Sequence, residues 1–236
     1  MNFFNKIFKK SNTNKLPSEF RLPSEIIEDV GSRTQWRTPP NFGWLICKLN
    51  QKELDYVWKC VENKKQSMTA RLAGNISASF VLEDTEDWFF KNTLSSLIYH
   101  YQEKFGVKGY PPDIVSVKSK PSVLQLSTWW VNYQKQHEFN PLHDHGGVYS
   151  FVIWLKIPTE YAEQNWDYEN NSPEKSSFSF IYHNILGQIN SAMFPLGKEF
   201  EGTMVFFPSK LMHVVYPFYN CEEDRISIAG NIGLLY

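Results

Sequence analysis

The sequence has few cysteines and no closely spaced cysteine pair. Cys47, Cys60 and Cys221 are odd in number and lie far apart in a chain of 236 residues. Structural zinc sites usually take paired cysteines, and small secreted domains usually carry an even-numbered disulfide framework. The sequence argues against both and favours reduced thiols, so we expect a cytoplasmic protein.

An excess of charge of one sign is also lacking. The chain has 24 Lys and Arg against 25 Asp and Glu, which gives a net charge of -1 and a pI near 6.6. No overall attraction to nucleic acid or to an anionic membrane is expected. The first ten residues mix phenylalanines with lysines, but this stretch is too short in apolar length for a signal peptide or a spanning helix.

The first half of the chain is expected to form two helices. Residues 51–65 carry apolar side chains at helical spacing, which make one stripe. A longer helix is expected over residues 86–105, with Thr85 as its cap and Gly106 at its end. Between the helices, residues 74–82 could be a loop followed by a short strand. The stripe of the first helix consists of Leu54, Val57, Trp58 and Val61.

From residue 122 onward the pattern changes to short strands separated by proline and glycine. Many short strands of this kind are typical of a β-sandwich or a jelly roll. We therefore expect a mainly β protein with flanking α-helices, in which the N-terminal helices brace a jelly roll. The expected strands are residues 122–133, 149–157, 178–183, 187–193, 203–207, 213–216 and 225–232.

One domain is sufficient for this chain, because 42% hydrophobic and 16% aromatic residues can bury a large core. Within it we expect an extended arm over residues 1–40, helical support over residues 41–119 and the jelly-roll core over residues 120–236. A polar segment, residues 159–177, interrupts the strands of the core and is either a solvated loop or a substrate lid.

Two neighbouring histidines and a distant third are the candidate metal ligands. His143 and His145 are two positions apart, which on an extended chain puts them on one face. His213 begins a later predicted strand. Imidazole suits iron, zinc, copper and nickel, and two close ligands followed by a distant one are typical of an open, reactive metal site.

Arg225 begins the last predicted strand and shares a face with Ser227. A guanidinium binds a carboxylate through two parallel hydrogen bonds, and a hydroxyl two residues along can donate a third. The alternative for Arg225 is a surface ion pair with Glu222, Glu223 or Asp224. Its place after the distal histidine favours the carboxylate clamp.

These motifs together resemble the Fe(II)- and 2-oxoglutarate-dependent oxygenases, whose pattern is His-x-Asp/Glu, a distal His and then Arg-x-Ser. The chain is most similar to small oxygenases of marine phages and bacteria that carry His-x-His. The resemblance implies a double-stranded β-helix, Fe(II), 2-oxoglutarate as cosubstrate, O2, and a place in the cytosol of a bacterium or a phage-infected host. The resembling residues are 130–133, 139–145, 150–158, 207–217 and 225–232.

The second ligand departs from the family pattern and leaves three alternatives. Most members carry a carboxylate where this sequence has His145, and three neutral imidazoles would make the iron a stronger Lewis acid. Asp144 is an alternative second ligand if the strand is irregular. In the third alternative His145 is the first ligand and Gly147 takes the carboxylate position, as in variants where chloride binds the vacated site.

The resemblance also implies roles for residues around the metal. Arg225 and Ser227 would hold the distal carboxylate of 2-oxoglutarate, and Asn132 and Tyr133 are further contacts by analogy, with sheet packing as their alternative. The reaction would release succinate and CO2 and usually hydroxylate the primary substrate, a peptide, protein or small molecule. A prolyl or other protein side chain is the lead candidate.

Two rival functions come from other classes. One is a three-histidine jelly-roll metalloenzyme that does not use 2-oxoglutarate, against which the Arg225-x-Ser227 pair argues. The other is a non-catalytic β-sandwich that binds a sugar or a protein, with incidental histidines. The oligomeric state is not encoded in any of these motifs.

Overall fold

The computed structural model describes residues 32, 34–35, 41–72, 74–106, 123–164 and 173–235. Every element below belongs to the unit Pro40–Tyr236. The arm expected over residues 1–40 lies almost entirely outside the described residues. So does the middle of the expected loop or lid, residues 165–172.

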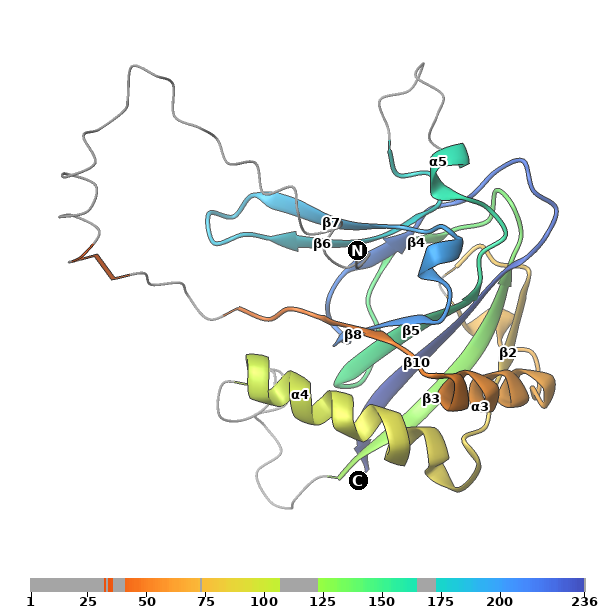
Figure 1. Cartoon of the computed structure of the whole chain (residues 1–236), viewed down its shortest axis with the longest axis horizontal. Helices are drawn as coiled ribbons and strands as arrows, with labels where there is room; N and C mark the ends of the chain where they lie inside the picture. The colour runs from red at the N-terminus through yellow and green to blue at the C-terminus, as the bar shows by residue number, and fades with distance from the viewer. Residues whose placement is uncertain are drawn as a thin grey trace. The chain divides into compact units, whose positions relative to one another are not determined.

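In the described residues, ten strands form two sheets (Figure 1), a larger one ordered β1-β8-β5-β10-β3-β2 and a smaller one ordered β4-β9-β6-β7. If β3 to β10 are counted 1 to 8, the sheets read 6-3-8-1 and 2-7-4-5, which is the strand order of a jelly roll. The expected fold class is confirmed. The strands are β1 (Leu45–Lys48), β2 (Ala78–Val81), β3 (Val123–Gln134), β4 (Asn140–His143), β5 (Tyr149–Lys156), β6 (Ser177–His183), β7 (Ile189–Pro195), β8 (Thr203–Pro208), β9 (His213–Val215) and β10 (Arg225–Leu235).

Helices cover the outer face of the larger sheet, and the smaller sheet covers its inner face (Figure 1). The helices α3 (Gln51–Glu62) and α4 (Ser95–Phe105) bury Val57 and Ile98 in one core cluster with residues of the larger sheet. A second cluster, which includes Trp154 and Phe180, fills the space between the sheets. The larger sheet is therefore buried on both faces, and its inner face carries the candidate site.

Strand β5 shows why this arrangement could be expected from sequence. Phe151 and Ile153 belong to the helix-side cluster, whereas Val152 and Trp154 belong to the cluster between the sheets. A strand that is buried on both faces reads as a continuous apolar run without polar alternation. The same reasoning applies to β8, and both strands lie within a residue of their expected bounds.

Two edge strands were not expected, β1 and β4. Strand β4 is four residues long and contains Pro141, which cannot donate a ladder hydrogen bond. It lies at the edge of the smaller sheet, where β9 is its one partner among the described strands, and a proline is tolerated at such an edge. A short strand with a proline gives a weak signal, although this one carries a candidate ligand.

The expected helix over residues 86–105 is wrong at its start. Glu86 and Asp87 have φ angles of 58° and 54°, inside the 3-10 turn η3 (Thr85–Asp87), so an α-helix cannot begin there. The helical chain resumes at Trp88 and passes through a π-helical turn, η4 (Phe90–Leu94), into α4. The expected end is confirmed, since α4 stops at Phe105 and Gly106 follows it.

The cap of this helical stretch is Asp84 and not Thr85. The carboxylate of Asp84 accepts hydrogen bonds from the backbone N–H groups of Phe89 and Phe90 at 2.8 and 2.9 Å, and from the Tyr56 hydroxyl at 2.7 Å. These bonds satisfy two N–H groups that the start of a helix leaves without a partner. They also tie the helical stretch to α3.

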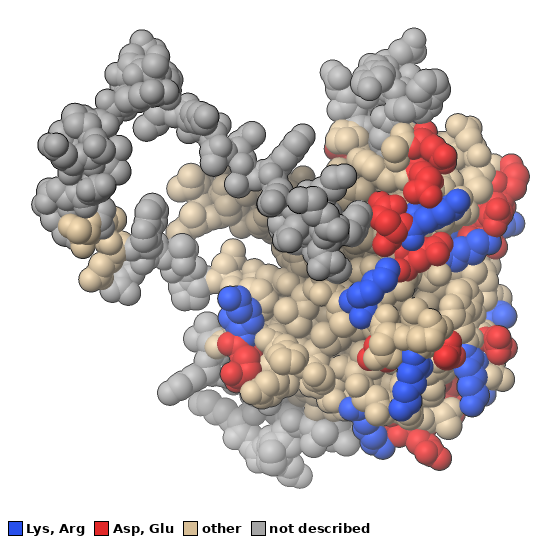
Figure 2. Space-filling view, in the orientation of Figure 1, with Lys and Arg blue, Asp and Glu red and all other residues tan. Residues whose placement is uncertain are grey.

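The described surface mixes charges of both signs. Figure 2 shows Lys and Arg interspersed with Asp and Glu on one face, and ion pairs such as Lys65–Glu83 and Lys156–Glu223 join them at 3.0 and 2.6 Å. No helix within the described ranges is both long enough and apolar enough to cross a membrane.

Loss of the Asp84 cap should destabilise the fold. Asp84→Ala removes three hydrogen bonds and should lower the free energy of unfolding by about 1–2 kcal/mol. Thr85→Ala should change it by less than about 0.5 kcal/mol. Urea unfolding of the two variants measures both effects, and an equal loss in Thr85→Ala would mean that Thr85 acts as the cap.

Candidate metal centre

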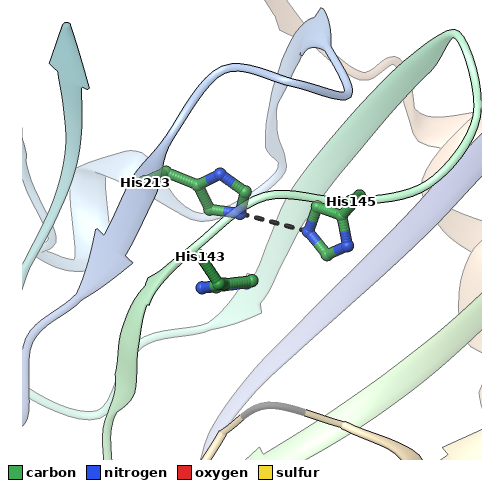
Figure 3. Close-up of side chains that lie close together, drawn as sticks. All are labelled: His143, His145 and His213. Atoms are coloured by element: carbon green, nitrogen blue, oxygen red, sulfur yellow. Dashed lines mark hydrogen bonds between the residues drawn. The ribbon is translucent and has the colours of Figure 1, made fainter.

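Three histidines from two strands and a loop converge beside the inner face of the larger sheet (Figure 3). His143 ends β4 and His213 begins β9, and the two are cross-strand partners whose ring centroids lie 4.3 Å apart. His145 follows in the loop after β4. One ligand nitrogen of each histidine lies within 4.8 Å of the others. Because imidazole nitrogens bind such metals at about 2.1 Å, one ion can contact all three after small side-chain rotations.

A backbone hydrogen bond positions His145. We expected His143 and His145 to share a face of one strand, but β4 ends at His143. The N–H of His145 instead donates to the carbonyl oxygen of Ser209 at 2.9 Å, in the turn before β9. Gly147 then has a φ of 97°, and a Cβ there would lie 2.7 Å from the carbonyl oxygen of Ile232, so the loop requires glycine at this position.

The hydrogen bonds of the rings orient two lone pairs into the cluster. Nδ1 of His143 lies 2.6 Å from the carbonyl oxygen of Pro141, and Nδ1 of His213 lies 2.8 Å from that of Leu211. A carbonyl oxygen only accepts, so both Nδ1 atoms carry the hydrogen and both Nε2 atoms keep a lone pair. Metal-bound histidines are commonly held in this way by a backbone carbonyl.

His145 carries the hydrogen that a metal would displace. Its Nε2 lies 3.1 Å from Nε2 of His213, the contact drawn dashed in Figure 3. Since Nε2 of neutral His213 is an acceptor, Nε2 of His145 is the donor in the metal-free protein. That hydrogen must leave Nε2 of His145 before the atom can bind an ion.

Burial keeps two of the rings neutral. It lowers the pKa of His145 to about 4 and that of His213 to about 3, and a proton on His143 would repel a second proton on either ring. Neutral imidazole is the form that binds a metal. At neutral pH these two rings are therefore already in the uncharged form that binds a metal.

Asp144 lies outside the cluster. Its carboxylate faces Nζ of Lys210 at 3.3 Å, and its side chain is 41% exposed. The structure thus brings together His143, His145 and His213, the first of the three ligand sets considered, and leaves Asp144 at the surface.

A cavity of about 250 Å³ adjoins the three histidines. Asn132 and Gln134 of β3, with Ser227 and Asn231 of β10, give it a polar wall. Gln134 and Asn231 were missed in the sequence, although they lie in phase with Asn132 and Ser227 at the two-residue period of a strand. The apolar lining includes Met68, Leu72, Ile76 and Trp130.

Of the two β3 residues expected at the cosubstrate, only Asn132 lines the cavity. Its Oδ1 accepts a hydrogen bond from the Ser79 hydroxyl at 2.7 Å. Tyr133 faces the other side of the sheet, where its ring packs against Phe80 at 6.0 Å and below Nζ of Lys64 at 5.7 Å. Successive side chains of a strand point to opposite faces, so both could not face the cavity. Tyr133 is a packing residue.

Arg225 is buried beside the cavity. Its side chain is among the largest that are fully buried, so it does not form the surface ion pair considered as its alternative. Its Nε and Nη2 donate to Oε1 of Gln134 at 3.1 and 2.9 Å, and Nη2 also donates to the carbonyl oxygen of Tyr216 at 2.8 Å. Nη1 donates to the Ser176 hydroxyl at 3.4 Å, and the ring of Phe218 covers one face of the guanidinium.

The charge of Arg225 has no counter-ion among the described residues. All the hydrogen-bond acceptors of its guanidinium described here are uncharged. Burial lowers the pKa of Arg225 to about 9, which still leaves it protonated at neutral pH. Because buried charges are normally paired, a small anion in the adjoining cavity would complete this environment.

Acid should destabilise the metal-free protein between pH 7 and pH 5. An unfolded histidine titrates near pH 6.5, and the folded His145 and His213 titrate lower. The unfolded state therefore binds more protons in this range, and the free energy of unfolding decreases as the pH is lowered. The two rings together should account for a loss on the order of 2–4 kcal/mol. Urea unfolding with a chelator present measures it. A His145→Gln/His213→Gln variant that keeps the wild-type pH dependence would contradict this assignment.

Comparison with known proteins gives a match to one family. Residues 128–231, which include the three histidines and Arg225, match the family described as "Putative 2OG-Fe(II) oxygenase". No curated protein matches the sequence.

Several solved structures are similar to the chain at 12% identity. A 2OG-Fe(II) oxygenase family oxidoreductase from Burkholderia pseudomallei covers 81% of this chain and 84% of its own, with a TM-score of 0.48. HygX from Streptomyces hygroscopicus, with nickel, 2-oxoglutarate and hygromycin B bound, matches over 90% of this chain and 87% of its own, with a TM-score of 0.48. A Pseudomonas putida prolyl-4-hydroxylase matches over 90% of this chain and 99% of its own, with a TM-score of 0.44.

The family match falls on the jelly-roll strands, and it spans the histidine cluster that lines the cavity and the arginine that is buried beside it. Over residues 128–231 the chain is similar to the 2OG-Fe(II) oxygenase family.

Proposed function

We propose that the protein is an Fe(II)- and 2-oxoglutarate-dependent dioxygenase that hydroxylates its primary substrate. The observation that carries this proposal is the convergence of three imidazoles beside a cavity that adjoins a buried, unneutralised arginine. His143, His145 and His213 would hold the iron. Three protein ligands leave the remaining positions of a six-coordinate ion for the cosubstrate and O2.

The chain's own residues would bind the cosubstrate and shield it. The charge of Arg225 would attract its distal carboxylate, and the Ser227 hydroxyl and the Asn132 amide line the same cavity. Trp130 and the other apolar lining residues would exclude water from the reacting atoms. When bound, Fe(II) and 2-oxoglutarate supply the oxidising chemistry, in which succinate and CO2 are released and one oxygen atom enters the substrate.

The ligand set differs in charge from that of most relatives. Three neutral imidazoles leave the full charge of the ion, whereas a ligand set with one carboxylate neutralises part of it. The protein would therefore hold a more strongly Lewis-acidic iron. The neighbouring Asp144 would not offset this charge strongly, because Lys210 pairs with it.

For the primary substrate, our proposal is a prolyl or other protein side chain. It would enter over the apolar lining formed by Met68, Leu72 and Ile76, which line the same cavity as the histidines. An apolar wall suits a hydrocarbon ring or chain, because the C–H bond to be oxidised must leave water to reach the metal.

The metal and cosubstrate assignment predicts a spectroscopic change. Anaerobic protein with Fe(II) and 2-oxoglutarate should develop the visible charge-transfer band of a chelated 2-oxo acid. Arg225→Ala should weaken 2-oxoglutarate binding by about tenfold or more, and His213→Ala should abolish metal binding in a calorimetric titration. Asp144→Ala is the matched control and should behave as wild type.

The rival functions give different results in the same titrations. Iron binding without any response to 2-oxoglutarate would indicate a three-histidine enzyme that does not use this cosubstrate. No metal binding at all would indicate a binding module.

The proposed substrate class is tested by turnover. Proline-containing peptides should raise the rate of succinate formation above the level without substrate, whereas matched peptides with alanine in place of proline should not. Stimulation by small metabolites alone would contradict the protein substrate and leave the dioxygenase assignment standing.

A further inference from the structure

Gln134 occupies the edge of Arg225 at which a carboxylate would bind. The two residues are directly opposite each other in the pairing of β3 with β10. Oε1 of Gln134 accepts from both Nε and Nη2 of Arg225, at 3.1 and 2.9 Å. The same pair of donors can grip a carboxylate through two parallel hydrogen bonds.

The rest of the guanidinium is closed to a ligand in the cavity. The other acceptors of Arg225, the Tyr216 carbonyl and the Ser176 hydroxyl, do not line the cavity, whereas Gln134 does. Arg225 itself is fully buried and does not line it. An anion that enters from the histidine side therefore meets Gln134 before it meets Arg225.

A hydrogen bond to the backbone holds the side-chain amide of Gln134 in place. Its Nε2 donates to the carbonyl oxygen of Glu138 at 2.5 Å, in the turn after β3. This bond points the oxygen of the amide toward Arg225. A neutral amide oxygen forms weaker hydrogen bonds with a guanidinium than a carboxylate does, so exchange of the two would be favourable once an anion is present.

We propose that Gln134 is a displaceable stand-in for the cosubstrate carboxylate. In the free protein its Oε1 satisfies Nε and Nη2 of Arg225. On binding, the distal carboxylate of 2-oxoglutarate takes these two donors and the Gln134 side chain turns aside. This inference rests on the proposed function.

The exchange would favour ligands that are also anchored at the metal. A simple monocarboxylate must displace Gln134 with no second attachment, whereas a 2-oxo diacid gains its chelation of the ion as well. Gln134 would thus contribute to selection of the cosubstrate without touching the metal.

Two substitutions at position 134 distinguish a Gln134 side chain that 2-oxoglutarate displaces from one that only holds Arg225 in place. Gln134→Glu places a permanent carboxylate against Arg225 and should weaken 2-oxoglutarate binding to the anaerobic Fe(II) protein by about tenfold or more. Gln134→Ala removes the competitor and should bind 2-oxoglutarate as tightly as wild type or more tightly. Gln125→Glu, the same change on β3 but away from the cavity, is the control. Calorimetry measures both the 2-oxoglutarate and the Fe(II) dissociation constants, and the latter should not change.

Side-chain amide resonances give a second measurement. In glutamine-labelled protein loaded with Zn(II), the Gln134 resonance, assigned by its loss in Gln134→Glu, should shift on addition of 2-oxoglutarate and stay unchanged with acetate. Gln134→Ala that binds 2-oxoglutarate as weakly as Gln134→Glu, or a Gln134 resonance that does not move, would overturn the inference. Wild-type protein that binds no 2-oxoglutarate would overturn the proposed function and this inference together.

Discussion

The pairing of β4 with β9 is the contact on which the candidate metal centre depends. It sets His143 opposite His213, and the turn between β8 and β9 then fixes His145 through the carbonyl oxygen of Ser209. Strand β4 lies at a sheet edge, and β9 is its one partner among the strands that the structure describes. Three imidazoles built around so short a pairing would gain order from a bound ion, because a ligand that binds only the folded state stabilises it.

The buried charge of Arg225 is the second constraint. The surrounding residues satisfy its donors with an amide, a hydroxyl and a backbone carbonyl, and a phenylalanine ring covers one face. Among the described residues, none of its hydrogen-bond partners supplies the negative charge that usually accompanies a buried cation. A buried charge without an opposite charge is typical of functional sites, where a ligand supplies the missing partner. The arginine and the histidines together make the cavity suited to a molecule that is anionic at one end and binds a metal at the other.

Much of this arrangement could be predicted from sequence, for identifiable reasons. The strands β5 and β8 are buried on both faces and read as unbroken apolar runs, and the stripe of α3 has clear helical spacing. The chemistry of imidazole and the spacing of the histidines indicate His143, His145 and His213 as candidate ligands, and the structure places these three side chains together.

The parts that could not be predicted depend on contacts between distant residues. Strand β4 was missed because a four-residue edge strand with Pro141 has almost no propensity signal. Asp84 was missed because it caps N–H groups five and six positions ahead, across two residues with positive φ. The role of Gln134 depends on its contact with Arg225, which the sequence does not show. The error at Tyr133 was avoidable, because the alternation of side chains along a strand already excludes Tyr133 from the face of Asn132.

A crystal structure of the protein grown anaerobically with Fe(II) would test the metal centre directly. We expect one ion bound by Nε2 of His143, His145 and His213 at about 2.1 Å, with Asp144 still directed to Lys210. An ion bound by the Asp144 carboxylate, or by fewer than three of these imidazoles, would contradict this expectation.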